Sequence, residues 1–146
     1  KQNLISEIEK SYSIKNKEEN IYSPILKDEI AMYLGGKWYS LIAHSKKYNS
    51  TFESLDPSIL SENILSPILG ITDEKTDKNI TFLDGTIPLS DLKTQVDSGE
   101  YKVAFILKPI DINSLKKVAD NNEIMPPKST YVEPKLRSGL TIYKLY

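Results

Sequence analysis

The chain has 146 residues, a net charge of −1 and 39% hydrophobic residues, which is the composition of one globular domain. It contains no cysteine, which excludes disulfides, thiolate metal sites and cysteine nucleophiles, and its single histidine excludes a His-cluster metal site. The slightly negative charge is unfavourable for binding nucleic acid, so no nucleic-acid partner is expected.

No apolar run approaches the ~18–20 residues that span a bilayer, and no signal peptide is visible. We therefore expect no membrane association and a cytoplasmic location. Because the chain opens on Lys1 and not on methionine, we expect it to be part of a longer protein.

The first half of the chain predicts two helices and a hairpin. Leu4, Ile5 and Ile8 have helical spacing within residues 2–10. Residues 29–44 hold two apolar runs around Gly35-Gly36, the pattern of a β-hairpin with a tight turn. Trp38 and Leu41 fall on opposite faces of this hairpin, so a sheet covered on one side and partly on the other is expected. A helix is predicted from Asp56 as N-cap, with Pro57 in its first turn, Pro67 bending or ending it and Gly70 terminating it.

The second half alternates strands and helices. We predict strands over 79–85, 101–109 and 139–146, and helices over 88–99 and 111–122. The 101–109 run is almost continuously apolar, which is typical of a strand buried on both faces. In the last helix Ile112, Leu115 and Val118 are expected to face inward.

The predicted fold class is therefore α+β, a single domain with one mixed β-sheet, an antiparallel hairpin and flanking helices. Helices between strands imply crossovers, so part of the sheet is expected to be parallel. We divide the chain into residues 1–28, an N-terminal helix and connector, and residues 29–146, the α+β domain proper.

The stretch from Met125 to Gly139 is the strongest candidate for a site. Three basic residues against one acidic residue give it a net charge of +2, whereas the whole chain carries −1. Its prolines stiffen the backbone, and a stiff loop with cations and hydroxyls can bind a phosphate or carboxylate. A simple crossing loop with solvated charges is the alternative interpretation. The candidate ligand-binding residues are Lys128, Ser129, Thr130, Tyr131, Lys135 and Arg137.

A second, weaker set of candidates is acidic. Residues 71–85 contain Asp73, Glu74, Asp77 and Asp84, the last followed by Gly85. Carboxylates can hold Mg²⁺ or act as a general base, yet the same residues are typical of an exposed turn. Asp77, Asp84 and Gly85 are retained as secondary candidates, and no metal site is predicted. No catalytic residue is identified.

Four blocks together resemble a family of bacterial and archaeal proteins known as domain of unknown function 1015. They are "YLGGKWYSL", "LDPSILSENILSPILGI", "TDKNITFLDGT" and "EIMPPKSTYVEPKLRSGL", in that order along the chain. The match covers about Glu29 to Leu145, and it implies that this chain is similar to the C-terminal part of the family.

The resemblance also implies an upstream part that carries an Asp-Gly-His-His-Arg motif similar to the phosphate-handling signature of ParB- and sulfiredoxin-like proteins. This chain has no such motif, so by itself it is not expected to be a complete enzyme. The expected function is to contribute an anion-binding loop to a nucleotide- or phosphate-dependent, kinase-like enzyme that uses a nucleotide with Mg²⁺. The expected partner is the N-terminal part of its own chain. The alternative is a structural or dimerisation domain, part of a homo-oligomer, whose basic loop is an interface strap.

Overall fold

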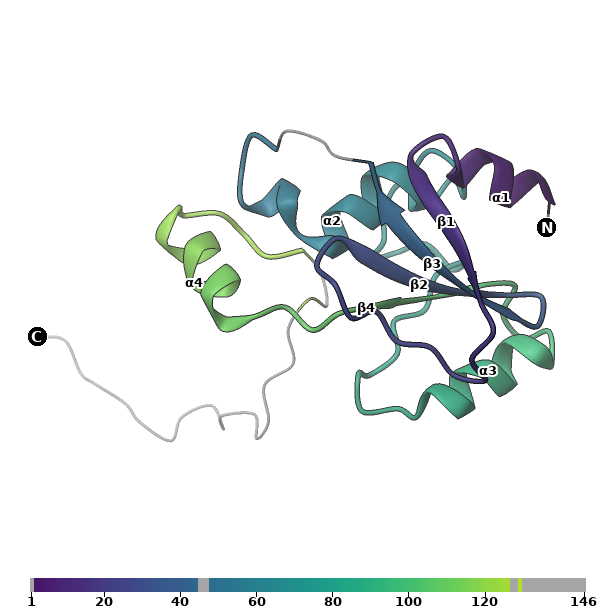
Figure 1. The fold of residues 1–146 in the computed structure, drawn as a ribbon. Coiled ribbons are helices and arrows are strands. Elements are labelled where there is room, and N and C mark those ends of the chain that lie inside the picture. The colour runs from purple at the N-terminus through teal and green to yellow at the C-terminus, as the bar shows by residue number, and fades with distance from the viewer. Residues whose placement is uncertain (1, 45–47, 127–128, 130–146) are drawn as a thin grey trace, which may run out of the picture.

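The computed structural model describes residues 2–44, 48–126 and 129 (Figure 1). One antiparallel sheet has the strand order β1-β3-β2-β4. Its strands are β1 (Tyr12–Lys17), β2 (Glu29–Leu34), β3 (Lys37–Ala43) and β4 (Ala104–Leu107). The α-helices are α1 (Gln2–Ile8), α2 (Asp56–Leu60), α3 (Leu89–Asp97) and α4 (Ile112–Asp120). A 3-10 turn, η1 (Phe52–Ser54), precedes α2, and a π-helical segment, η2 (Ser61–Leu65), continues it. The α+β class is confirmed, and no helix in these ranges is long and apolar enough to cross a membrane.

The predicted hairpin forms the centre of the sheet. Gly35 and Gly36 have φ angles of 56° and 82°, the left-handed values that a two-residue primed turn requires. Leu34 pairs with Lys37 across the turn, and β2 and β3 stay in register to Glu29 and Ile42. The turn therefore sets the register of the two central strands.

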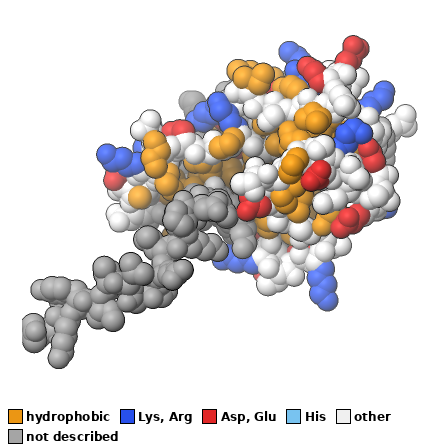
Figure 2. Space-filling model, turned by 90° about the horizontal axis from the view of Figure 1, so that it is seen from below, with side chains coloured by type: hydrophobic (Ala, Val, Ile, Leu, Met, Phe, Trp, Pro, Cys, Tyr) orange, Lys and Arg blue, Asp and Glu red, His pale blue; other side chains and the backbone are white. Residues whose placement is uncertain are grey.

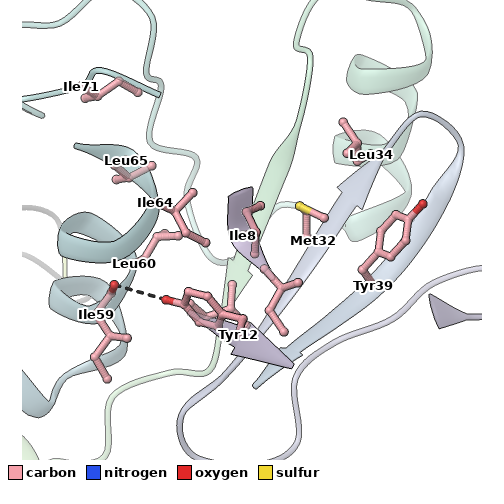
Figure 3. Close-up of a cluster of buried hydrophobic side chains, with 12 residues drawn as sticks. Ile8, Tyr12, Met32, Leu34, Tyr39, Ile59, Leu60, Ile64, Leu65 and Ile71 are labelled. Carbon is pink, nitrogen blue, oxygen red and sulfur yellow. Dashed lines mark hydrogen bonds between the residues drawn. The ribbon is translucent and has the colours of Figure 1, made fainter. Parts of the chain in front are cut away.

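Each face of the sheet carries its own hydrophobic cluster, as the opposite orientations of Trp38 and Leu41 predict. The larger cluster joins Leu41 and Met32 of the sheet to Ile8 of α1 and to Ile64 of η2 (Figure 3). The smaller one joins Trp38 and its neighbours to α3. A fully buried aliphatic side chain contributes about 1.5–3 kcal/mol, so both faces contribute to stability.

Several sequence predictions need correction. All strand pairs in the described part of the chain are antiparallel, so the parallel pairing that we expected does not occur there. Residues 79–85 form no strand; turns at Asp77 and Asp84 bracket the run, and Phe82 is 42% exposed. Ile112 points outward and is 72% exposed, whereas Val118 of the same helix is buried as expected.

Strand β1 was not predicted. It belongs to the residues 1–28 that we treated as helix and connector, yet it pairs with β3 along its whole length. Tyr12 is fully buried, and its hydroxyl donates to the carbonyl oxygen of Ile59 at 3.2 Å, which ties β1 to α2 (Figure 3). The predicted closing strand over 139–146 lies outside the described residues.

A buried carboxylate organises the start of β2. Glu29 is 3% exposed, and its side chain accepts hydrogen bonds from the hydroxyls of Tyr22 and Ser40. The backbone amides of Ile25 and Leu26 also donate to it, at 2.9 and 3.0 Å. Burial alone would raise the pKa of Glu29, but these four donors outweigh it and hold the pKa at about 2. The 22–26 loop is therefore fastened to the sheet by an ionised group.

Replacing Glu29 by glutamine is expected to lower the free energy of unfolding by about 2–3 kcal/mol, because an amide cannot accept from all four donors. The folded pKa lies below the ordinary value of 4.5, so this contribution is present above pH 4.5 and is lost as the pH falls towards 2. Urea unfolding at several pH values measures both effects. Glu100→Gln, at an exposed position, is the control. Equal stability of Glu29→Gln and wild type at pH 7 would contradict this role.

Candidate functional site

Most of the predicted anion-binding loop lies outside the described residues. Lys128, Thr130, Tyr131, Lys135 and Arg137 are in that part, and Ser129 alone is described. The amide of Ser129 donates to the carbonyl oxygen of Pro126 at 3.3 Å, and its hydroxyl oxygen is buried without a hydrogen-bond partner among the described residues. The described part of the candidate site is therefore the segment that leads into the loop.

That segment is anchored to the start of η1, in the part of the domain formed by η1 and α2, here called the α2 corner. The carboxylate of Glu123 accepts from the amide of Phe52 at 3.1 Å. The side-chain amide of Asn121 donates to the hydroxyl of Thr51, also at 3.1 Å. These two bonds join residues about seventy positions apart in the sequence. They return the chain from α4 to the main body of the domain just before the basic stretch begins.

A small cavity of about 140 Å³ lies at this corner. Pro126 lines it together with residues of α2 and η2. Ser58, which is 4% exposed, has a buried hydroxyl oxygen without a hydrogen-bond partner among the described residues. Such a group costs about 1–3 kcal/mol unless something satisfies it. The lining residues are Phe52, Pro57, Ser58, Ser61, Glu62, Glu74 and Pro126.

The described charges at this cavity are negative. Glu62 and Glu74 contribute two carboxylates, so the cations that an anion needs would have to come from the basic stretch after Pro126. A mixed site of this kind can hold an anion next to a hydroxyl or an ammonium group. It can also hold the loop itself, if its lysines and arginine pair with the two glutamates.

The secondary candidates lie in exposed turns of the 71–85 loop. Asp77 and Asp84 each accept a bond from the amide two residues later, at 2.8 Å, which is the geometry of Asx turns on a surface loop. Gly85 is exposed on the same loop. Over residues 2–44, 48–126 and 129, no three histidine, aspartate or glutamate side chains are grouped so that they could hold a metal ion.

A carboxylate pair that the sequence did not reveal lies at the start of α2. Asp56 was predicted to cap its own helix, but it makes no capping bond there. Its Oδ1 instead accepts from the amide of Asp28 at 3.2 Å. Asp28 has φ of 61°, a left-handed conformation, and its Oδ1 is buried without a partner among the described residues. Two segments 28 residues apart therefore place two carboxylates side by side.

The environment of Asp56 disfavours its charged form. Burial, followed by the charge of Asp28, raises the pKa of Asp56 to about 6. Burial together with Asp28, Asp56 and Glu62 raises the pKa of the Tyr48 hydroxyl. Only the Asp-Pro dipeptide was visible in the sequence, and it indicated a helix start; the partner Asp28 is fixed by the tertiary structure alone.

A larger open cleft of about 550 Å³ lies at the other end of the sheet, by the hairpin turn, and contains no predicted site residue. Two of its three lysines are already engaged. The Lys17 ammonium stands 4.3 Å from the centre of the Tyr22 ring, and Lys93 pairs with Asp97 at 2.7 Å. The cleft is lined by Asn16, Lys17, Glu18, Glu19, Asn20, Gly36, Lys37, Trp38 and Lys93.

Comparisons with models of known protein families, with curated proteins and with solved structures give no match for this chain.

Replacing Asp56 by asparagine is expected to raise the free energy of unfolding at pH 7 by about 1–2 kcal/mol. The side-chain oxygen still accepts from Asp28, while the buried charge is removed. Because the folded pKa of about 6 lies above the ordinary 3.8, the wild type loses stability as the pH rises between these values, and the variant should not. Thermal unfolding from pH 3.5 to 7 measures this. Asp120→Asn, at an exposed position, serves as control, and a less stable Asp56→Asn at pH 7 would refute the interpretation.

Proposed function

We propose that this chain is the C-terminal domain of a cytoplasmic, kinase-like enzyme that depends on a phosphate or a nucleotide, and that it supplies part of the enzyme's anion site. Lys128, Ser129, Thr130, Tyr131, Lys135 and Arg137 would form the anion-binding side. The sequence resemblance to the domain of unknown function 1015 supports the presence of a second, upstream part that completes the site and, with a nucleotide and Mg²⁺, carries out the chemistry.

The observation that carries this proposal is the anchored entry into the loop. The bonds of Asn121 and Glu123 fix the chain just before Pro126, and Pro126 borders a cavity with the hydroxyl of Ser58, which has no hydrogen-bond partner within the described part of the chain. Rigid anchoring lowers the entropy that a loop loses when it binds a ligand. A phosphoryl oxygen would satisfy the buried hydroxyl, while lysine and arginine offset its charge, as phosphoryl transfer requires.

The alternative is that the basic stretch is an interface strap with no ligand. Glu62 and Glu74 favour this alternative, because they line the same cavity and are suitable partners for the basic side chains of the loop. The domain would then cap or dimerise the catalytic half. The two proposals differ in what the basic residues stabilise, a bound anion or the folded domain.

Replacing Lys128 and Arg137 together by alanine in the full-length protein is expected to weaken binding of ADP, ATP or pyrophosphate on the order of tenfold to a hundredfold, because two charge-assisted contacts are lost. Calorimetric titration measures the affinity and thermal unfolding measures the stability. The double variant Lys75→Ala, Lys78→Ala removes the same charge from the exposed 71–85 loop and should change neither.

Unchanged affinity and turnover in the Lys128→Ala, Arg137→Ala protein would contradict the anion-site proposal. If the same variant also lowered the unfolding temperature, the strap would be supported in its place.

A further inference from the structure

The open cleft of about 550 Å³ beside the hairpin turn is built around a tryptophan. Trp38 is 2% exposed, and its ring packs on that of Tyr33 with 4.7 Å between the ring centres. Its indole N–H donates to the carbonyl oxygen of Asn20 at 3.0 Å, which ties the segment after β1 to the sheet. Helix α3 borders the cleft through Lys93. Two of the segments that bound the cleft are therefore held together by a buried indole.

Two ammonium groups at the cleft are held in place by aromatic rings. Lys17, at the end of β1, places its ammonium 4.3 Å from the centre of the Tyr22 ring. The ammonium of Lys93 lies 5.4 Å from the centre of the Tyr33 ring and 2.7 Å from the carboxylate of Asp97. The hydroxyl of Tyr33 donates to the same carboxylate at 2.8 Å. A lysine that is already held in one position loses less rotamer freedom when a ligand binds.

Both ammonium groups can still bind an anion. An ammonium has three N–H donors; the face of a ring attracts its charge without taking a donor, and a single carboxylate oxygen takes one. Lys37, which follows the hairpin turn, is exposed and brings a third ammonium to the cleft. An anionic ligand in the cleft would therefore have three positive side chains around it.

The other polar groups of the cleft narrow the class of ligand. Glu18 and Glu19 are exposed at the cleft, so three lysines minus two glutamates leave a charge of only +1. Two carboxylates would repel a compact polyphosphate. The side-chain amides of Asn16 and Asn20 both donate and accept hydrogen bonds, which suits the N–H and C=O groups of a peptide backbone. Trp38 is too deeply buried to stack on a nucleobase.

The wider surface does not impose one sign of charge on a ligand. Figure 2 shows basic and acidic side chains interspersed over the main body of the domain as it is seen from below. Selection at the cleft therefore depends on the groups that line it.

We propose that this cleft binds a short polypeptide segment that carries acidic side chains. Lys17, Lys37 and Lys93 would pair with the carboxylates of the segment, and Asn16 and Asn20 would bond its backbone. The volume of about 550 Å³ lies within the range of roughly 300–1,000 Å³ that is usual for ligand pockets, so a few residues fit. Exposed ion pairs are individually weak and are screened by salt, so the binding is expected to weaken as the ionic strength rises.

Trp38 is the only tryptophan of the chain, so its fluorescence reports directly on the cleft. Titration of the complete 146-residue chain with a tetraglutamate peptide with blocked ends is expected to give a saturable change. The apparent Kd should increase several-fold between about 10 and 150 mM salt, because the contacts are charged. A tetraserine peptide with blocked ends should give no saturable change.

Replacing Lys17 and Lys93 together by glutamine is expected to weaken tetraglutamate binding roughly fivefold to tenfold, because two ion pairs are lost. The double variant Lys75→Gln, Lys78→Gln is the matched control, which removes the same charge from the exposed 71–85 loop and should leave the Kd unchanged. Equal Kd values for the two double variants would overturn the proposal.

Amide shifts of the unaltered chain give a second test that does not depend on how the variants fold. Tetraglutamate should shift the amides of residues 16–20 and 36–38 with one Kd, the value that the fluorescence gives. The absence of saturable shifts at millimolar peptide, or shifts confined to residues 128–139, would refute a peptide site at the cleft. Tighter binding of pyrophosphate than of tetraglutamate at the same amides would also refute it, and would make the cleft a general phosphate site.

Discussion

The contacts that join the 22–28 segment to the rest of this domain depend on one buried carboxylate. Glu29 begins the central strand β2 and is held in its ionised form by two hydroxyls and two amides. An ionised group is costly to bury unless hydrogen bonds replace its hydration, so the polypeptide from Tyr22 to Leu26 has to wrap around it. Once that loop is fixed, Ile25 meets Lys108 beside β4, and Asp28 meets Asp56 at the start of α2. Three elements far apart in the sequence are positioned in this way.

The same set of contacts explains why several buried polar groups lie close to the start of α2. The α2 corner receives β1 through Tyr12, the start of β2 through Asp28, and the chain returning from α4 through Asn121 and Glu123. Among the residues that the structure describes, the buried hydroxyl of Ser58 and the buried Oδ1 of Asp28 at this corner have no hydrogen-bond partner.

Local patterns predicted the elements whose determinants are local. The glycine turn predicted the hairpin, and helical spacing predicted α1 and α3. Strand β1 was missed because its YSIKNK sequence is largely polar, and pairing with β3 stabilises it. The 79–85 run has strand-like residues, yet no described strand pairs with it, and propensity alone does not make a strand.

For the candidate site, too, local features could be predicted from the sequence and long-range contacts could not. The basic stretch is visible in the sequence because charge and proline content are local properties. Its attachment to Phe52 and Thr51, the cavity at Ser58 and the pairing of Asp28 with Asp56 depend on contacts across 28 to 71 positions. A single sequence contains no signal for such contacts. Ile112 was assigned inward by helical spacing, but that spacing cannot tell which partner, if any, the face meets.

We propose that the basic stretch and the α2 corner form one anion site. Its most direct test is an NMR titration of this chain with pyrophosphate, following the amides of Ser58, Ser61 and residues 128–139. We expect saturable shifts in both sets with the same apparent Kd, because one ligand would contact the loop and the corner together. No shifts at millimolar pyrophosphate, or shifts spread evenly over exposed lysines such as Lys10 and Lys78, would contradict it.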